Sequence, residues 1–312
     1  MGVIGERMVD YFSDRENGPR PRIGERVSPS AWGGIVGLVQ SLIATGAFGV
    51  KFPEMCPDGN GPCGTDESAL ALAVGAELPG LAWPLETHTT EPDDGFFAKK
   101  VQSAPDTLVV LDFVEFCYRS VAAPIQEGFH SFFSHHHLSF NVAIGRASFR
   151  SDINRLFSRN NLAYELNEQG QIQRLAPPIL REALAQASVS TGDVTLDQML
   201  DDARRKYLNP DSRVRREALE RLWDCWERLK SLEAPSNKKQ SVSMLLAKSA
   251  NEPKFLSALD AEACALTDIG NSFHIRHSEV TQSQVTDSQH VDYLFHRLFA
   301  LVRLLAAKRS AR

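Results

Sequence analysis

The residues best suited to chemistry lie close together near position 275. The segment Asn271-Ser-Phe-His274-Ile-Arg276-His277-Ser-Glu279 combines imidazoles, a guanidinium and an amide. An imidazole can accept or donate a proton at neutral pH, and a guanidinium can stabilise the charge of a phosphorane. Metal-free RNA cleavage, in which the ribose 2′-OH attacks its own phosphodiester, needs these two groups. The same cations also suit the last turn of a helix, where the helix dipole favours them.

A second group of candidate residues is the histidine cluster in FHSFFSHHHLSF, formed by His130, His135, His136 and His137. Neutral imidazoles are common metal ligands. Adjacent histidines point in different directions, however, and the sequence lacks carboxylates at the spacing of the zinc-protease helix motif. We therefore expect an ordered core loop of aromatic and imidazole side chains, with no metal and no cofactor. A metal hydrolase built on His135 to His137 is one alternative.

The cysteines are few and scattered along the chain: Cys56, Cys63, Cys117, Cys225 and Cys264. An odd number at irregular spacing is typical of reduced thiols in a cytosol, so we expect a cytoplasmic protein. Six residues separate Cys56 from Cys63, whereas zinc fingers use two to four. A zinc site there would need His88 or the histidine cluster to contribute ligands.

A basic stretch over residues 204–239 is a candidate RNA-binding surface, because it holds eleven Lys or Arg against six Asp or Glu. Such a stretch on a helical surface could follow a phosphate backbone. It also contains three pairs of opposite charge at i,i+4: Arg213 with Glu217, Arg216 with Glu220 and Asp224 with Arg228. These pairs equally predict a solvated, salt-bridged helix face. The N-terminal arm could add Arg15, Arg20, Arg22 and Arg26.

The bulk composition is that of an ordinary folded protein, and it excludes several functional classes. With 43% hydrophobic and 23% charged residues, the chain is neither disordered nor a disulfide-stapled miniprotein. A formal charge of -5 gives no global signal for nucleic acid, so any RNA site must be local. Residues 1–10 lack the apolar core of a signal peptide, and no apolar run reaches the roughly 18 residues that span a bilayer. We expect no membrane association, and the sequence lacks a P-loop, a GxGxxG and a GxSxG motif.

The first 192 residues predict an α-rich domain. Residues 12–31 predict an extended arm that leads to the first helix. Ser28 should cap this helix ahead of Pro29, and the helix should end near residues 46–49. Residues 53–65 hold three Pro and three Gly and predict a loop. A small hairpin over 162–175 should turn at Gly170. Further helices are expected from Thr65–Ser68 to Gly75, and over 108–123, 151–158 and 178–187.

The remaining residues, 193–312, predict a helical bundle. Asp211 should cap a helix that carries Leu219, Leu222, Trp226 and Leu229 on one stripe. Helical periodicity recurs over 241–250, 253–275 and 287–308. Amphipathic helices joined by short loops form a bundle. The expected fold is therefore mainly α, with an N-terminal α-rich domain that contains the small β-hairpin and a C-terminal helical bundle.

Three stretches resemble bacterial abortive-infection proteins of the AbiJ type. They are Arg204–Tyr207 with Pro210–Lys230, Phe273–Glu279, and Asn160–Leu166 with Gly170–Leu175. The resemblance covers roughly residues 150–312. It implies phage defence and a HEPN-like C-terminal domain, a helical fold in which many members are ribonucleases that act as dimers.

The resemblance also implies roles for the segment near position 275. HEPN ribonucleases use an Arg followed, after four to six residues, by a His. Asn271 and His277 occupy this frame, with Asn in the place of Arg, and Arg276 directly precedes the histidine. His277 would then be the general acid or base, Arg276 would stabilise the phosphorane, and Asn271 would orient the phosphate or the imidazole.

The expected partners are RNA and a second copy of the chain in a homodimer, and the N-terminal domain could bind a protein partner. The alternative function is a non-catalytic HEPN-like module that binds RNA or a protein as a sensor. It predicts no RNA cleavage by the wild-type protein.

Overall fold

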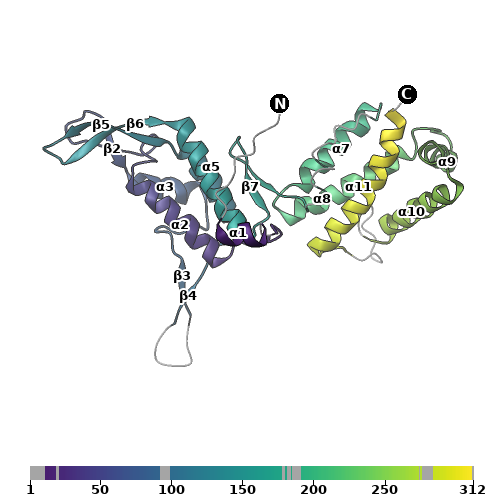
Figure 1. Cartoon of the computed structure of the whole chain (residues 1–312), viewed down its shortest axis with the longest axis horizontal. Helices are drawn as coiled ribbons and strands as arrows, with labels where there is room; N and C mark the ends of the chain where they lie inside the picture. The colour runs from purple at the N-terminus through teal and green to yellow at the C-terminus, as the bar shows by residue number, and fades with distance from the viewer. Residues whose placement is uncertain are drawn as a thin grey trace. The chain divides into compact units, whose positions relative to one another are not determined.

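The computed structural model describes residues 11–18, 21–91, 99–177, 180, 184, 191–273, 275 and 284–310. The protein is mainly α-helical with small two-stranded sheets, which confirms the predicted fold class (Figure 1). It divides into two compact units, residues 1–175 (unit 1) and residues 176–312 (unit 2). None of the described helices has both the length and the apolar character that crossing a membrane requires.

Unit 1 is built around helices that bury one shared apolar core. They are α2 (Pro29–Ala44), α3 (Glu67–Glu77), α4 (Thr107–Ser120) and α5 (Val142–Arg159), and the short helix α1 (Phe12–Asn17) precedes them in the chain. Ser28 caps α2 as predicted, because its Oγ accepts a hydrogen bond from the Ala31 N–H at 3.2 Å. The Trp32 side chain on α2 is fully buried, and its indole N–H donates to the Glu86 carbonyl oxygen at 2.8 Å.

In the part of unit 1 that the structure describes, four hairpins accompany the helices, and each consists of two antiparallel strands. The strands are β1 (Pro53–Met55) with β2 (Pro62–Thr65), β3 (His88–Glu91) with β4 (Lys99–Gln102), β5 (Ala123–His130) with β6 (His135–Asn141), and β7 (Tyr164–Leu166) with β8 (Ile172–Arg174). The last hairpin confirms the prediction over 162–175, and Gly170 has the positive φ of +77° that its turn requires.

Two expectations for unit 1 are wrong, because residues 53–65 and the histidine cluster form hairpins instead of loops. Pro53 and Pro62 each stand at the first residue of a strand, where a missing N–H is tolerated. Residues 123–141 pair as β5 and β6, so the histidines alternate between the two faces of a ribbon.

The N-terminal arm is attached to the β7 hairpin rather than fully extended. Arg22 donates hydrogen bonds to the carbonyl oxygens of Leu162, at 3.0 Å, and of Tyr164. Gly24 forms a bridge to Leu162, and α1 occupies part of the arm. Arg22 therefore anchors the arm within unit 1, and Arg20 lies outside the described residues.

Unit 2 is the helical bundle that the sequence predicts. Its helices are α7 (Val194–Tyr207), α8 (Ser212–Leu229), α9 (Lys238–Ser249), α10 (Pro253–Ser272) and α11 (Ser288–Ser310). Asp211 caps α8 as expected, accepting from the Arg213 N–H at 2.8 Å. The stripe of Leu219, Leu222, Trp226 and Leu229 is fully buried. The helix expected over 178–187 falls largely outside the described residues.

The predicted charge pairs on α8 are only partly correct. Arg216 and Glu220 approach to 3.6 Å at i,i+4, as expected. Arg213 instead pairs with Asp211 at 2.8 Å. Arg228 makes a bidentate pair with Asp193, which caps α7, at 2.7 and 2.8 Å. Arg213 and Arg228 therefore pair with the N-cap residues of α8 and α7 instead of with the predicted partners on α8 itself.

Candidate functional site

Of the three residues predicted to be catalytic, Asn271 alone falls within the described part of the chain. It is exposed on the last turn of α10, which ends at Ser272. Arg276 and His277 lie outside the described residues, as do His274 and Glu279. The described segments on either side of these residues are the end of α10 and residues 284–287 before α11.

A pocket of about 170 Å³ opens between the start of α8 and the segment that leads into α11. Arg213, Arg215 and Arg216 line it from the start of α8, while the other side is lined by Gln284, Val285, Thr286, Ser288 and Val291. Each of the three guanidinium groups carries a positive charge, and carboxylates partly offset it, because Asp211 pairs with Arg213 and Glu220 pairs with Arg216. The pocket therefore offers guanidinium donors that could hold a phosphate group.

Two of these arginines also fasten the two walls of the pocket together. Arg215 is 1% exposed, and its Nη2 donates to Ser288 Oγ at 2.9 Å. Arg216 Nη1 donates to the Val285 carbonyl oxygen at 2.9 Å. The Arg213 side chain is 84% exposed. Arg213 is therefore the arginine of the pocket that could bind a ligand from solvent without breaking a hydrogen bond between the two walls.

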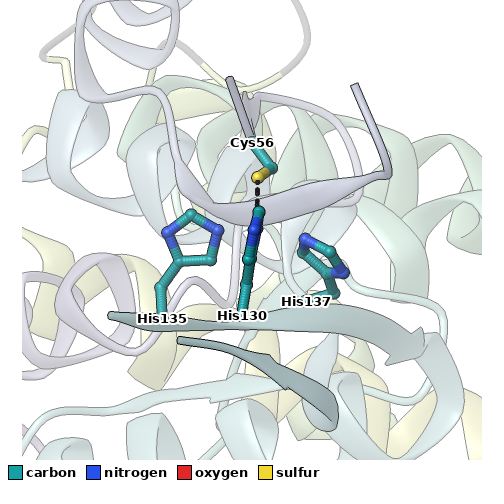
Figure 2. A group of neighbouring side chains, drawn as sticks. All are labelled: Cys56, His130, His135 and His137. Carbon is teal, nitrogen blue, oxygen red and sulfur yellow. Dashed lines mark hydrogen bonds between the residues drawn. The ribbon is translucent and has the colours of Figure 1, made fainter. Parts of the chain in front are cut away.

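The second arrangement with chemical potential lies in unit 1, and it brings a cysteine to three histidines. Cys56 follows β1, His130 is the last residue of β5, and His135 and His137 lie on β6. Figure 2 shows the three imidazoles side by side with the Cys56 sulfur above His130. One ligand atom from each residue lies within 4.8 Å of the others, and Cys56 Sγ is 3.4 Å from His130 Nδ1.

His136 is excluded from this group because it faces the other side of the strand. Its Nδ1 lies 3.0 Å from the Glu127 carbonyl oxygen, and its ring packs 4.9 Å from the Phe129 ring. Adjacent histidines therefore do diverge, as the sequence predicts. The signal that the sequence interpretation missed is the alternation His135-x-His137, which a strand places on one face.

Asp58 adds a charge to the edge of the cluster. Its Oδ2 lies 3.0 Å from His130 Nδ1. Hydrogen bonding from the Cys56 thiol and from the Asn60 N–H holds the pKa of Asp58 well below its ordinary value. Burial raises the pKa of the Cys56 thiol. In the absence of a metal, the cluster therefore combines an ionised carboxylate with a protonated thiol.

Comparison with known proteins places the chain in a family. The family model described as AbiJ N-terminal domain 4 matches residues 10–190, which is more than half of the sequence. The chain belongs to the AbiJ family. AbiJ proteins are abortive-infection proteins, so membership of the family supports the predicted role in phage defence. No curated protein and no solved structure matches.

The AbiJ match and the resemblance seen in the sequence cover different parts of the chain. The resemblance covers roughly residues 150–312, whereas the family model matches residues 10–190. The matched region includes both the Cys56 loop and the β5–β6 hairpin. The two overlap at the β7–β8 hairpin. The family assignment is confirmed, and the HEPN-like nature of the C-terminal bundle stays a prediction.

Proposed function

We propose that unit 2 of this AbiJ-family protein is a HEPN-like ribonuclease that binds RNA and cleaves it without a metal during phage defence. The supporting observation is the arginine-lined pocket at the start of α8. Its second wall begins at Gln284, seven residues after His277 in the sequence. A phosphate held in the pocket would therefore contact the end of the connection between α10 and α11, whose sequence includes Arg276 and His277.

The proposed reaction uses the RNA's own ribose as the nucleophile. The 2′-oxygen attacks the adjacent phosphorus while its proton passes to His277 as general base. The bond from phosphorus to the 5′-oxygen then breaks, and that oxygen takes up a proton. Arg276 stabilises the negative charge of the phosphorane, and Asn271 orients the phosphate or the imidazole. The products are a 2′,3′-cyclic phosphate and a 5′-hydroxyl.

A homodimer would bring two sets of these residues to one RNA. With one set, a single imidazole must accept the proton of the 2′-OH and then donate a proton to the 5′-oxygen. With two sets, one imidazole can act as the base while the other acts as the acid. The prediction is a dimer in solution, which light scattering after gel filtration measures directly. A monomer that cleaves RNA at full rate would contradict the proposed dimer but not the proposed cleavage reaction.

The central test compares cleavage of a single-stranded RNA by wild type, His277→Ala and His290→Ala. His290 is exposed in the first turn of α11 and serves as the matched histidine control. Loss of a general acid–base group lowers a rate by about 10²–10⁴-fold. We expect that loss, together with loss of toxicity in cells, for His277→Ala and not for His290→Ala.

The competing function is a sensor or interaction module without catalysis. It predicts that the purified wild-type protein binds RNA or a protein partner and leaves RNA intact. Equal cleavage by wild type and His277→Ala would likewise remove His277 from the mechanism.

A further inference from the structure

We propose that Cys56, His130, His135 and His137 bind one zinc ion that fastens the β1–β2 hairpin to the β5–β6 hairpin. This site lies in unit 1, and it rests on side-chain positions that the ribonuclease proposal does not use.

Strand geometry explains why three histidines converge. His130 and His135 are direct cross-strand partners in the β5–β6 register, so their side chains stand on the same face. His137 is two residues further along β6 and returns to that face. The imidazole centroids accordingly lie 5.5 to 5.7 Å apart. His136 stands on the opposite face with Phe129.

The thiol reaches the histidines through the neighbouring hairpin. β2 lies beside β6 in unit 1, which brings the loop that joins β1 to β2 over the histidine face (Figure 2). Backbone hydrogen bonds hold the loop, because the Cys56 N–H donates to the Gly61 carbonyl oxygen and the Gly59 N–H donates to that of Cys56, both at 2.9 Å. Cys56 is 2% exposed, and in this loop conformation its sulfur faces His130.

The ligand atoms are close to the arrangement that zinc requires. Zinc binds sulfur at about 2.3 Å and imidazole nitrogen at about 2.0–2.1 Å, so tetrahedral ligand atoms stand about 3.3–3.6 Å apart. The Cys56 Sγ and His130 Nδ1 are already at 3.4 Å, and all four atoms lie within 4.8 Å of one another. The largest separation therefore exceeds the tetrahedral value by about 1 Å, which rotation of the imidazoles would have to close on zinc binding.

An independent observation favours a cation between these side chains. The Nε2 atoms of His135 and His137 are buried, and neither has a hydrogen-bond partner. Asp58 Oδ1 lies 3.9 Å from His137 Nε2, which is too far for a hydrogen bond. Buried polar atoms are normally satisfied, and two such nitrogens beside one sulfur are what a metal ion would satisfy.

The ligand set selects zinc and a structural role. One thiolate and three neutral imidazoles suit zinc, whereas magnesium and calcium prefer oxygen ligands. Four protein ligands close the coordination sphere and leave no position for a substrate. On binding, the Cys56 thiol releases its proton to solvent and the sulfur bonds to the ion as thiolate. The site therefore stabilises the two hairpins against each other.

The test measures zinc in the purified full-length protein after incubation with zinc and gel filtration. We expect about one zinc ion per chain. The variants Cys56→Ser and His135→Ala should lose most of it, while Cys63→Ser and His136→Ala should keep it. Cys63 lies in the same hairpin and outside the cluster, and His136 lies between two proposed ligands, so each is a matched control.

Cobalt keeps the test decisive if a variant folds poorly. Cobalt in the wild-type site should give a thiolate-to-cobalt charge-transfer band, which Cys63→Ser keeps and Cys56→Ser loses. Wild-type protein that retains neither zinc nor cobalt would overturn the proposal. Zinc that survives in His130→Ala and disappears in Asp58→Asn would overturn this ligand set in favour of the carboxylate.

Discussion

The indole N–H of Trp223 on α8 donates a hydrogen bond to the carbonyl oxygen of Leu266 on α10, at 3.1 Å, inside the core of unit 2. Gly270 permits this approach, because a Cβ there would lie 2.2 Å from the indole nitrogen. The contact fixes the last turn of α10, which carries Asn271 and leads into the segment with Arg276 and His277. The proposed catalytic segment therefore follows a helix end that packs against the core of unit 2.

The first prediction is that Gly270→Ala destabilises unit 2. The added methyl group must displace the Trp223 ring, and overpacking of a core costs about 1–3 kcal/mol. Gly37→Ala is the matched control, since it adds the same methyl group within α2 where nothing lies within 4 Å. The control should be neutral or stabilising by about 0.5–1 kcal/mol. Urea unfolding followed by circular dichroism measures both, and equal stabilities would contradict the packing described.

The second prediction concerns RNA affinity at the arginine pocket. Arg213→Ala should weaken binding of a single-stranded RNA, and the slope of log affinity against log salt should fall by about one. Arg119→Ala is the control, because the Arg119 side chain is exposed on α4 in unit 1 and lies outside both the pocket and the basic stretch 204–239. Fluorescence anisotropy at several salt concentrations measures both slopes. Identical slopes for the two variants would exclude Arg213 from the RNA site.

The third prediction follows from the pair that joins α10 to α11. Arg297 donates to both Glu262 oxygens, at 2.7 and 2.9 Å, and this hydrogen bonding lowers the pKa of Glu262. The lowered pKa means that the pair stabilises the fold above the unfolded pKa of about 4.3 and ceases to do so as pH falls through the folded value. Glu262→Gln should therefore cost up to about 1 kcal/mol at pH 7.

This cost should disappear in acid. Unfolding free energies of wild type and Glu262→Gln should converge as the pH falls from the unfolded pKa of about 4.3 through the lowered pKa of Glu262 in the folded state. Glu252→Gln is the control, because Glu252 is exposed at the start of α10 and its side chain makes no cap hydrogen bond. A difference for Glu262→Gln that stays constant with pH would show that the pair's charge contributes nothing.

The fourth prediction concerns the reactivity of the thiols. Burial raises the pKa of Cys225 to about 12 and also raises the pKa of Cys117, whereas Cys264 is exposed. Alkylation requires the thiolate, so iodoacetamide at neutral pH should modify Cys264 long before the two buried residues. Peptide mass spectrometry of the native protein measures the order. Early modification of Cys117 would contradict the burial of α4.

Local signals in the sequence were sufficient for much of the helical fold. Ser28 and Asp211 cap the helices where they were expected, because a side-chain oxygen beside a helix start satisfies a free N–H wherever the helix packs. Gly170 marks its turn because few other residues adopt a positive φ. The buried stripe through Leu219 and Trp226 follows from helical periodicity.

The cysteine–histidine cluster depends on pairing that no local signal encodes. Cys56 and His130 are 74 positions apart, and two hairpins must form before they meet. Proline and glycine in residues 53–65 favour a loop, and adjacent histidines conceal the alternation that matters. Arg228 shows the same limit, because it binds Asp193 across 35 positions instead of Asp224 four positions away. Tertiary partners can outweigh helical neighbours.

Analysis of the RNA ends after cleavage tests the central claim most directly. Mass spectrometry of fragments made by the full-length protein should show 2′,3′-cyclic phosphate and 5′-hydroxyl ends, and His277→Ala should yield no such fragments. Fragments with 3′-hydroxyl and 5′-phosphate ends would contradict attack by the ribose oxygen. An intact RNA after incubation with wild type would contradict the ribonuclease itself.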